Sequence, residues 1–112
     1  MIWSGLPSLG SLRAFSAVAE TGSYTNAGSR LNVTHAAVSQ QVKSLEARLG
    51  FSLVVRQGRG IALTRDGAIL ARDLDKGFAV IRGGIESLTG ADAARPVQIT
   101  MSSAFAVEWL MP

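Results

Sequence analysis

The sequence of 112 residues predicts a mainly α-helical fold with a small β-hairpin. Three observations support this prediction. Apolar residues recur at spacings of three and four in four stretches, which is the period of an amphipathic helix. Helix-ending residues follow the first three stretches, and a turn flanked by glycines separates two β-prone runs further along the chain. The expected order is therefore three short helices, a hairpin and a long helix.

A first helix is predicted over residues 8–21. The residues of its apolar face are Leu9, Leu12, Phe15, Val18 and Ala19. Gly22 ends this helix, because glycine enters the left-handed conformation of a helix C-terminus without steric cost. Ser23 then supplies a hydroxyl that can cap a second helix, which ends near Leu31. The inward residues of this second helix are Tyr24, Ala27 and Leu31.

Asn32 and Val33 are predicted to form a turn, since asparagine tolerates the left-handed backbone conformation. Thr34 caps a third helix, which ends at Leu49 before Gly50. The inward stripe of this helix consists of Val38, Val42, Leu45 and Leu49. Two helices joined by so short a turn form a helix-turn-helix, and residues 34–49 are its predicted recognition helix.

A two-stranded hairpin is predicted next. Residues 53–55 are β-prone and residues 61–63 alternate in polarity, while Arg59 lies between Gly58 and Gly60 in the connecting turn. A hairpin in this place is the wing of a winged helix-turn-helix.

A long helix is predicted from its cap, Thr64, to about Leu88 or Thr89. Asp66 lies in its first turn, where a negative charge suits the helix dipole. Its apolar seam consists of Leu74, Phe78, Ile81, Ile85 and Leu88. Spacings of four and three are typical of helices that pair. Because some 25 residues span roughly 37 Å, which is longer than a three-helix core, we expect a dimerisation helix. Packing of the seam on the chain's own domain is the alternative.

Three parts of the chain are predicted. Residues 1–64 form the winged helix-turn-helix domain, and residues 65–89 form the linker and dimerisation helix. Residues 90–112 form a linker and the first fragment of an incomplete domain, because residues 90–95 are small and polar and are followed by only one strand-like run and the start of a helix.

Composition argues against several classes of function. The chain has no cysteine, so a disulfide framework, a thiolate nucleophile and a cysteine-based zinc site are excluded. The single histidine, His35, cannot hold a metal ion alone, and we expect no cofactor and no metal. No stretch approaches the ~18–20 apolar residues of a membrane span, and residues 1–7 lack the pattern of a signal peptide. No membrane partner is therefore expected, and the expected location is the cytoplasm.

Positive charge is concentrated in the first half of the chain. Residues 1–64 carry six basic and two acidic side chains, a net charge of +4 with histidine neutral. Residues 65–112 carry five basic and six acidic side chains, a net charge of −1. A basic half suggests a polyanionic partner. Because the excess is modest, the argument depends on which exposed side chains the fold presents.

The outward face of the recognition helix has the composition of a base-reading surface. At about 100° per residue, the side opposite the inward stripe holds Ala36, Ser39, Gln40, Lys43 and Ala47. Gln40 can pair bidentately with adenine, and Ser39 can donate or accept. Ala36 can touch a thymine methyl, and Lys43 can meet a phosphate or guanine. His35, near the edge, can contact a base or the backbone. For each residue alone, a solvated helix surface is the alternative.

Further predicted DNA contacts lie outside that face. Ser23 and Thr25 begin the second helix, whose N-terminus favours a phosphate, with helix capping alone as the alternative. Thr34, which caps the recognition helix, is counted with them. Arg59 is expected at the minor groove or flanking phosphates, the alternative being an exposed turn arginine. Arg56 is expected either to contact a phosphate or to pair with an acid of its own domain.

The run from Leu12 to Gly67 resembles the N-terminal domain of LysR-type transcription regulators. The matching segments include Gly22-Ser23-Tyr24-Thr25, Val33-Thr34-His35-Ala36-Ala37-Val38-Ser39, Leu45-Glu46, Leu49-Gly50 and Leu63-Thr64 with Gly67. The segments similar to the glycine-cleavage regulator subgroup include Leu6-Pro7-Ser8-Leu9, Lys43-Ser44-Leu45-Glu46 and Trp109-Leu110-Met111-Pro112.

The resemblance implies a winged helix-turn-helix, a linker helix that forms a homodimer, and a C-terminal effector domain resembling periplasmic binding proteins. That effector domain would sense a small molecule, and nearly all of it is expected to lie beyond Pro112. A dimer of dimers is expected only in the full-length protein. By position, the base and phosphate contacts of the family carry over to His35, Ala36, Ser39, Gln40, Lys43 and Arg59.

Two residues depart from the family pattern. Gly28 stands where the family usually has alanine, which should cost the second helix about 0.5–1 kcal/mol. Val54 stands where it usually has phenylalanine, which leaves less apolar bulk beneath the wing. Neither position belongs to the base-reading face. Glu46, on the flank of the third helix, is expected to hold a structural ion pair.

The predicted function is sequence-specific binding of double-stranded DNA by a transcription regulator, with a dimer reading two half-sites about one helical turn or a multiple apart. The second hypothesis is an adaptor or dimerisation module that acts only on partner proteins, which predicts a salt-insensitive complex without a DNA footprint. The third is an enzyme. The sequence shows no arrangement of nucleophile and base, no phosphate loop and no metal set, so we expect no enzymatic activity.

Overall fold

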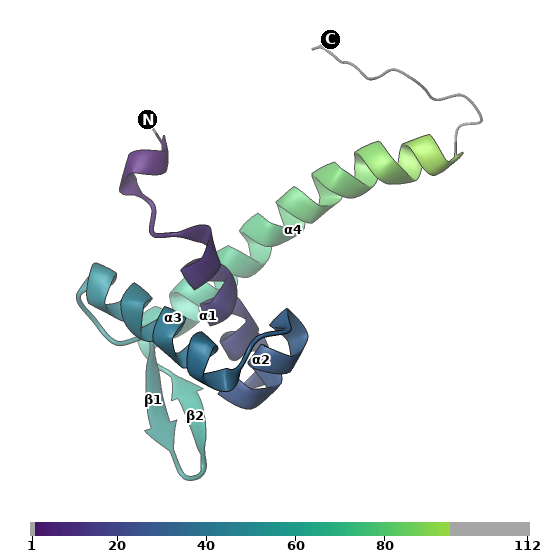
Figure 1. Cartoon of the computed structure of the whole chain (residues 1–112). Helices are drawn as coiled ribbons and strands as arrows, with labels where there is room; N and C mark the ends of the chain where they lie inside the picture. Colours follow the sequence, from purple (N-terminus) through teal and green to yellow (C-terminus); the bar gives the residue numbers. More distant parts are fainter. Residues whose placement is uncertain (1, 95–112) are drawn as a thin grey trace. The chain divides into compact units, whose positions relative to one another are not determined.

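The computed structural model describes residues 2–94, and its elements follow the predicted order (Figure 1). They are the 3-10 helix η1 (Ile2–Gly5), helices α1 (Leu9–Thr21), α2 (Tyr24–Leu31) and α3 (His35–Leu49), strands β1 (Val54–Gln57) and β2 (Gly60–Leu63), and helix α4 (Arg65–Ala94). The mainly α-helical winged fold is confirmed, and η1 is the one described element that the pattern did not predict.

Local chemistry sets the ends of the first three helices. The hydroxyl caps are Ser8, Ser23 and Thr34, each accepting a hydrogen bond from a backbone N–H three residues on. The C-terminal residues with left-handed backbones are Gly22, Asn32 and Gly50. The sequence predicts five of these six places; Ser8, predicted as the first residue of its helix, is instead its cap.

The core lies where α1, α2 and α3 meet. Its largest fully buried side chains are Phe15, Leu45, Leu53, Val18, Val38 and Val42. Three of the four residues of the predicted inward stripe of α3 are therefore buried, while Leu49 is only half-buried. Leu53, which the sequence predicts as part of the hairpin, precedes β1 and is buried in the core. Burial of such a side chain stabilises the fold by roughly 1.5–3 kcal/mol.

The wing is an antiparallel pair in which Val54 lies opposite Leu63 and Gln57 lies opposite Gly60. Its turn contains Gly58 and Arg59, and Gly58 has a φ of 59°. A positive φ at only the first of two central residues matches a type II′ hairpin, where glycine is favoured.

The first turn of α4 packs closely on the chain segment that leads into the wing. The Thr64 N–H donates to the Leu53 carbonyl oxygen at 2.9 Å, and the Thr64 hydroxyl donates to the Ser52 carbonyl oxygen at 2.8 Å. The same hydroxyl caps α4 by accepting from the Gly67 N–H at 2.9 Å. Gly67 is buried, and a Cβ there would collide with the Leu53 carbonyl oxygen. Glycine is therefore required at this crossing.

The chain divides into two compact units, Met1–Lys76 and Gly77–Pro112, and the described part of the second unit, residues 77–94, is entirely helical. The functional division into residues 1–64, 65–89 and 90–112 stays a prediction. Within residues 2–94, no helix has both the length and the apolar character of a membrane span.

Helix α4 continues through Ala94, the last residue that the structure describes, so its predicted end at Leu88 or Thr89 is wrong. Residues 90–94, predicted as the start of a linker, are helical. A single Gly90 costs only about 1 kcal/mol relative to alanine, and alanine, the best helix former, follows at 91, 93 and 94. The strand and helix predicted for residues 96–102 and 104–110 lie outside the described residues.

Candidate nucleic-acid interface

The face predicted to read bases lies exposed on α3. Ala36, Gln40 and Lys43 are exposed, and Ser39 is half-buried. The opposite side of the helix is held by Val38, Val42 and Leu45, whose side chains are at most 1% exposed. Because a helix is stiff over four turns, this buried stripe fixes the direction in which the polar side chains point. His35 is exposed in the first turn of the same helix.

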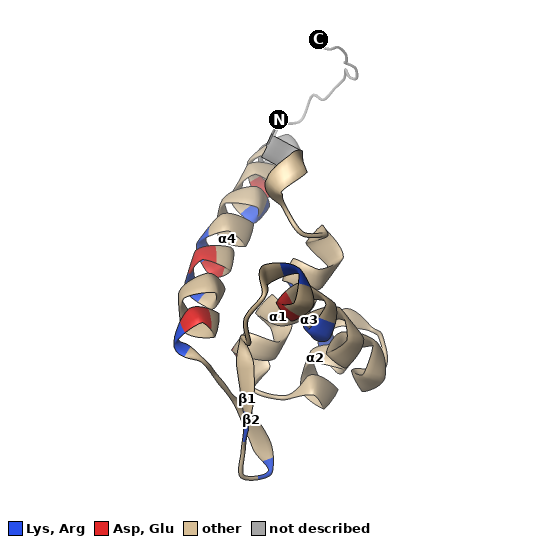
Figure 2. Cartoon of the chain, turned by 90° about the vertical axis from the view of Figure 1, so that its left-hand side faces the viewer, with Lys and Arg blue, Asp and Glu red and all other residues tan. Residues whose placement is uncertain are grey.

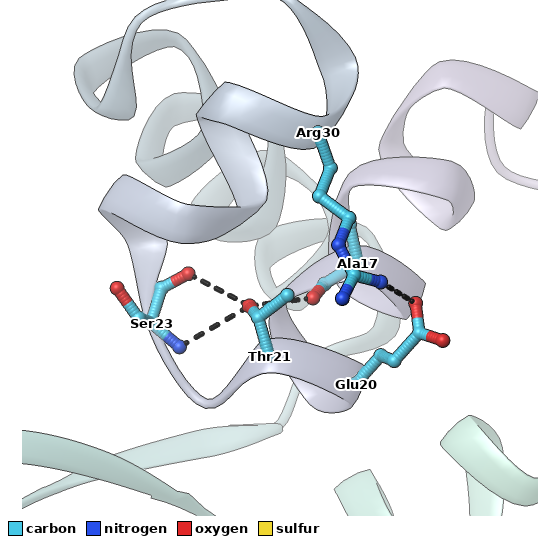
Figure 3. A network of polar contacts seen from close by, with 5 residues as sticks. All are labelled: Ala17, Glu20, Thr21, Ser23 and Arg30. Atoms are coloured by element: carbon cyan, nitrogen blue, oxygen red, sulfur yellow. Dashed lines mark hydrogen bonds and ion pairs between the residues drawn. The ribbon is translucent and has the colours of Figure 1, made fainter.

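A polar network joins the end of α1 to the start of α2 (Figure 3). The Thr21 hydroxyl donates to the Ala17 carbonyl oxygen at 2.8 Å and also lies 3.0 Å from the Ser23 carbonyl oxygen. Arg30 pairs with Glu20 at 2.9 Å. Both partners of this ion pair are largely exposed, so it contributes at most about 1 kcal/mol. The network fixes the place of the α2 N-terminus relative to α1.

Two residues predicted to contact DNA, Ser23 and Thr34, use their hydroxyl oxygens to cap a helix. The Ser23 hydroxyl oxygen accepts from the Asn26 N–H at 3.1 Å, and the Thr34 hydroxyl oxygen accepts from the Ala37 N–H at 3.1 Å. The capping roles are thus confirmed. Each hydroxyl keeps a proton that it can donate to a phosphate, and Thr25 is exposed beside Ser23.

Glu46 makes no ion pair within residues 2–94, so the prediction of a structural ion pair is wrong there. Its carboxylate oxygen Oε2 accepts hydrogen bonds from the Leu53 N–H at 2.7 Å and the Val54 N–H at 3.2 Å. Glu46 therefore holds the start of the wing to the flank of α3. The physical reason for the difference is that two adjacent backbone donors satisfy a carboxylate as well as a cation does.

Tyr24 lies close to this junction, a placement that the helical pattern alone could not give. Burial raises the pKa of its phenol, and the negative charge of Glu46 raises it further, while Arg56 acts in the opposite direction. The pKa of Tyr24, at the start of α2, therefore responds to the charges of Glu46 on α3 and Arg56 on β1.

The wing carries only positive charge. Arg56 and Arg59 are its two charged residues, and both are exposed. Figure 2 shows blue and no red on the hairpin of β1 and β2. Neither makes an ion pair with any residue of the part of the chain that the structure describes. Of the two roles predicted for Arg56, pairing with an acid of its own domain therefore finds no support among residues 2–94.

The predicted seam of α4 is increasingly exposed along the helix. Leu74 and Phe78 are half-buried, whereas Ile81 and Ile85 are each 56% exposed and Leu88 is 70% exposed. Exposed apolar side chains at this spacing are typical of helices that pair with another helix.

A shallow hollow of about 200 Å³ lies on the α1 side of α3. Gln41 lines it together with Arg13, Ala14, Val33 and Val38. Gln41 thus faces away from the direction of its neighbour Gln40. Over the described residues, no three histidine, cysteine or acidic side chains gather as a metal site.

Comparison with known proteins decides the family. Residues 9–68 match the family model of bacterial regulatory helix-turn-helix proteins of the LysR family. This chain belongs to the LysR family. The match covers the three helices, the wing and the start of α4, so the resemblance of residues 12–67 is confirmed.

Relatives with known roles match nearly the whole chain. The AhcY transcriptional activator HvrB of Rhodobacter capsulatus is 42% identical over 110 residues, 98% of this chain and 38% of HvrB. The glycine cleavage system transcriptional activator of Escherichia coli is 37% identical over 107 residues, 96% of this chain and 35% of that protein. This LysR-family chain therefore spans little more than a third of the length of these relatives.

Solved structures of the family include complexes with DNA. The CbnR DNA-binding domain in complex with DNA matches with a TM-score of 0.64 and 35% identity, over 76% of this chain and 99% of that chain. The BenM DNA-binding domain in complex with benA site 1 DNA matches with a TM-score of 0.68 and 30% identity, over 78% and 97%.

Proposed function

We propose that this LysR-family chain binds double-stranded DNA sequence-specifically, as the DNA-binding part of a transcription regulator. The observation that carries the proposal is the exposed polar face of α3, held by a buried stripe in a family whose solved domains include DNA complexes. The recognition helix enters the major groove, and the wing meets the minor groove or the backbone.

Base reading is assigned to the N-terminal half of α3. Gln40 contacts adenine and Ser39 a base edge, while Ala36 touches a thymine methyl. Lys43 and His35 contact a base or a neighbouring phosphate. These five side chains are exposed or half-exposed on one helix.

Phosphate contacts surround that half of the helix. Their proposed residues are Ser23, Thr25, Thr34, Arg56 and Arg59. Exposure of both wing arginines without an ion pair in residues 2–94 supports this role, as does the capped N-terminus of α2, where backbone N–H groups favour an anion.

A homodimer through α4 completes the proposal. The exposed side chains of Ile81, Ile85 and Leu88 support pairing with a second copy. The whole protein is proposed to respond to a small molecule through a domain beyond this chain, to act in the cytoplasm and to have no enzymatic role. The transcriptional activators to which it is similar support this picture.

Selection of bound sequences from a random DNA pool tests the proposal, followed by fluorescence anisotropy over a range of salt concentrations. We expect a selected site with two related halves and an affinity that falls steeply with salt. Absence of binding to any duplex at low salt would contradict the proposal, because lysine and arginine contacts alone give some affinity. A complex only with proteins would favour the adaptor hypothesis.

Matched variants separate base reading from phosphate binding. Gln40→Ala should cost about 1–3 kcal/mol on the selected site and less on random DNA, whereas Gln41→Ala, which removes the same side chain from the α1 side of α3, should change neither. Arg59→Ala should weaken binding to all sequences alike and lower the salt slope by about 1, with Arg13→Ala on α1 as its control. Equal losses on every sequence for Gln40→Ala would refute its role.

A further inference from the structure

We propose that Asp75 and Arg82 determine which chain pairs with α4 and in which register, by forming ion pairs between two copies of this chain. This inference rests on the homodimer through α4 that is part of the proposed function. Both side chains are exposed on α4. Neither forms an ion pair with any residue of the described range 2–94. Two unpaired and opposite charges on one helix are available to a partner that presents the same two charges.

The two charges lie beside the apolar seam, on one flank of it. The seam alternates between two positions of the seven-residue repeat of paired helices. The first position is held by Ala71, Phe78 and Ile85, and the second by Leu74, Ile81 and Leu88. Asp75 and Arg82 each come directly after a residue of the second position, where side chains border the contact between paired helices. Gly77 and Gly84 come directly before the first position and border the opposite flank.

One antiparallel register places the opposite charges against each other. When Phe78 lies opposite Ile81 of the second copy, Asp75 lies beside Arg82 of that copy. Because two-fold symmetry repeats every contact, Arg82 also lies beside Asp75 of the second copy. A shift by one repeat brings Asp75 against Asp75 or Arg82 against Arg82, so like charges oppose it. In a parallel pair the residues beside Arg82 are Gly77 of the second copy and its neighbours, and no opposite charges meet.

The same register also covers the seam over its whole length. Residue 65 lies opposite residue 94 of the second copy, which spans all of α4 (Arg65–Ala94). Ile85 and Leu88, which are 56% and 70% exposed, then lie over Leu74 and Ala71 of the second copy. A shift by one repeat takes the apolar partner away from one of these two pairs of residues. Apolar burial and charge therefore favour the same register.

Two local features fit a second helix in this place. Asp75 lines an open hollow together with Glu20 of α1 and Arg72 of α4, which leaves room for a guanidinium beside the Asp75 carboxylate. On the other flank, a Cβ added at Gly77 or Gly84 would meet nothing within 4 Å, so no contact inside the chain requires glycine there. In the proposed register Gly77 lies beside Gly84 of the second copy, where the missing Cβ atoms let two backbones approach closely.

Charge reversal in the full chain tests partner choice and register together. Asp75→Arg brings arginine against arginine in its own dimer, and Arg82→Asp brings aspartate against aspartate. Each variant alone should therefore dimerise about tenfold more weakly than the parent at low salt. An equimolar mixture of the two restores opposite charges at both contacts and should dimerise as the parent does, as should the double variant Asp75→Arg/Arg82→Asp. Sedimentation velocity over a range of concentrations measures all four samples.

The matched control is Lys76→Glu, which reverses an exposed charge next to Asp75 but outside both flanks of the seam. It should leave the dimer unchanged. Circular dichroism establishes that every variant is folded. High salt screens exposed ion pairs, so the difference between the single variants and the parent should shrink as salt is added.

Cysteine cross-linking supplies a readout that does not depend on charge. The chain has no cysteine of its own, so introduced thiols report only on their own positions. Gly77→Cys mixed with Gly84→Cys should form a disulfide-linked dimer under mild oxidation, because the register brings these positions together. Gly77→Cys mixed with Gly83→Cys should not, since position 83 lies outside the flank. Equal cross-linking in both mixtures would overturn the proposed register.

The two levels of the proposal fail in different ways. If the parent chain is monomeric at every concentration, the proposed homodimer falls and this inference falls with it. If the parent dimerises and the single charge reversals dimerise equally well, or if their mixture dimerises no better than either alone, only the role of Asp75 and Arg82 is refuted.

Discussion

Helices α3 and α4 carry the same sequence pattern but bury it to very different extents. On α3, Val38, Val42 and Leu45 are at most 1% exposed, whereas on α4 Ile85 is 56% and Leu88 is 70% exposed. Apolar residues at spacings of three and four predict that a helix has an apolar face, but the spacing does not identify what covers that face. The difference teaches that the stripe of α3 is satisfied within its own unit, and it supports a partner outside this chain for α4.

The largest expected effect comes from the same substitution made in both helices. Leu45→Ala removes a core side chain and should lower the free energy of unfolding by about 2–5 kcal/mol. Leu88→Ala should change it by no more than about 0.5 kcal/mol under conditions where the chain is monomeric. Urea denaturation followed by circular dichroism measures both. Similar losses would show that the two stripes do not differ as their exposure indicates.

A charge in the α4 seam should act on association rather than on folding. Ile85→Glu places a carboxylate in the proposed interface and should weaken the dimer at least about 30-fold. Val80→Glu is the matched control, because Val80 is 75% exposed on the same helix but lies outside the seam. Sedimentation velocity over a range of concentrations distinguishes them. Dimers that survive Ile85→Glu would contradict pairing through this face.

Glu46 links α3 to the start of the wing through its side chain. Among residues 65–94 of α4, no side chain makes such a hydrogen bond to another element. Glu46→Ala leaves the Leu53 and Val54 N–H groups without their acceptor and should lower the free energy of unfolding by about 1–2 kcal/mol. Glu46→Gln should lose less, because its amide oxygen still accepts. Thermal unfolding is the measurement. Glu20→Ala, which breaks an exposed pair, is the control, and a loss no larger than this would refute the link.

The features that the sequence predicts well are those set by neighbouring residues. Ser23 and Thr34 cap their helices, and Asn32 adopts a left-handed conformation, because these effects depend on atoms within three or four residues. The buried stripe of α3 was predictable for the same reason. From that stripe the exposed position of Gln40 follows by helix geometry alone.

The features that were missed depend on contacts between elements. Glu46 binds backbone groups seven and eight residues away, and Gly67 is required only because α4 crosses the Leu53 backbone. Gly28 is unfavourable by helix propensity, but propensity takes no account of the turn after α2, whose Val33 carbonyl oxygen would lie 2.7 Å from a Cβ at position 28. Spacing does not encode such distances, so these roles emerge only once the helices and the wing are placed in space.

The smallest expected effect is on the pH dependence of stability and concerns Tyr24, a partly buried titratable residue of the first unit. Its pKa is raised above the ordinary value of about 10 for a tyrosine phenol, first by burial and then by the charge of Glu46. The unfolded chain therefore loses this proton at a lower pH than the folded chain. The stability that Tyr24 contributes is fully present below the pKa of the unfolded chain, about 10, and is lost as the pH rises through the pKa of the folded chain. Tyr24→Phe cannot titrate, so its stability should decline less between neutral pH and pH 11 than that of the parent. Urea denaturation at a series of pH values measures the free energy of unfolding of both proteins. An equal decline in both would show that the pKa of Tyr24 is not raised by folding.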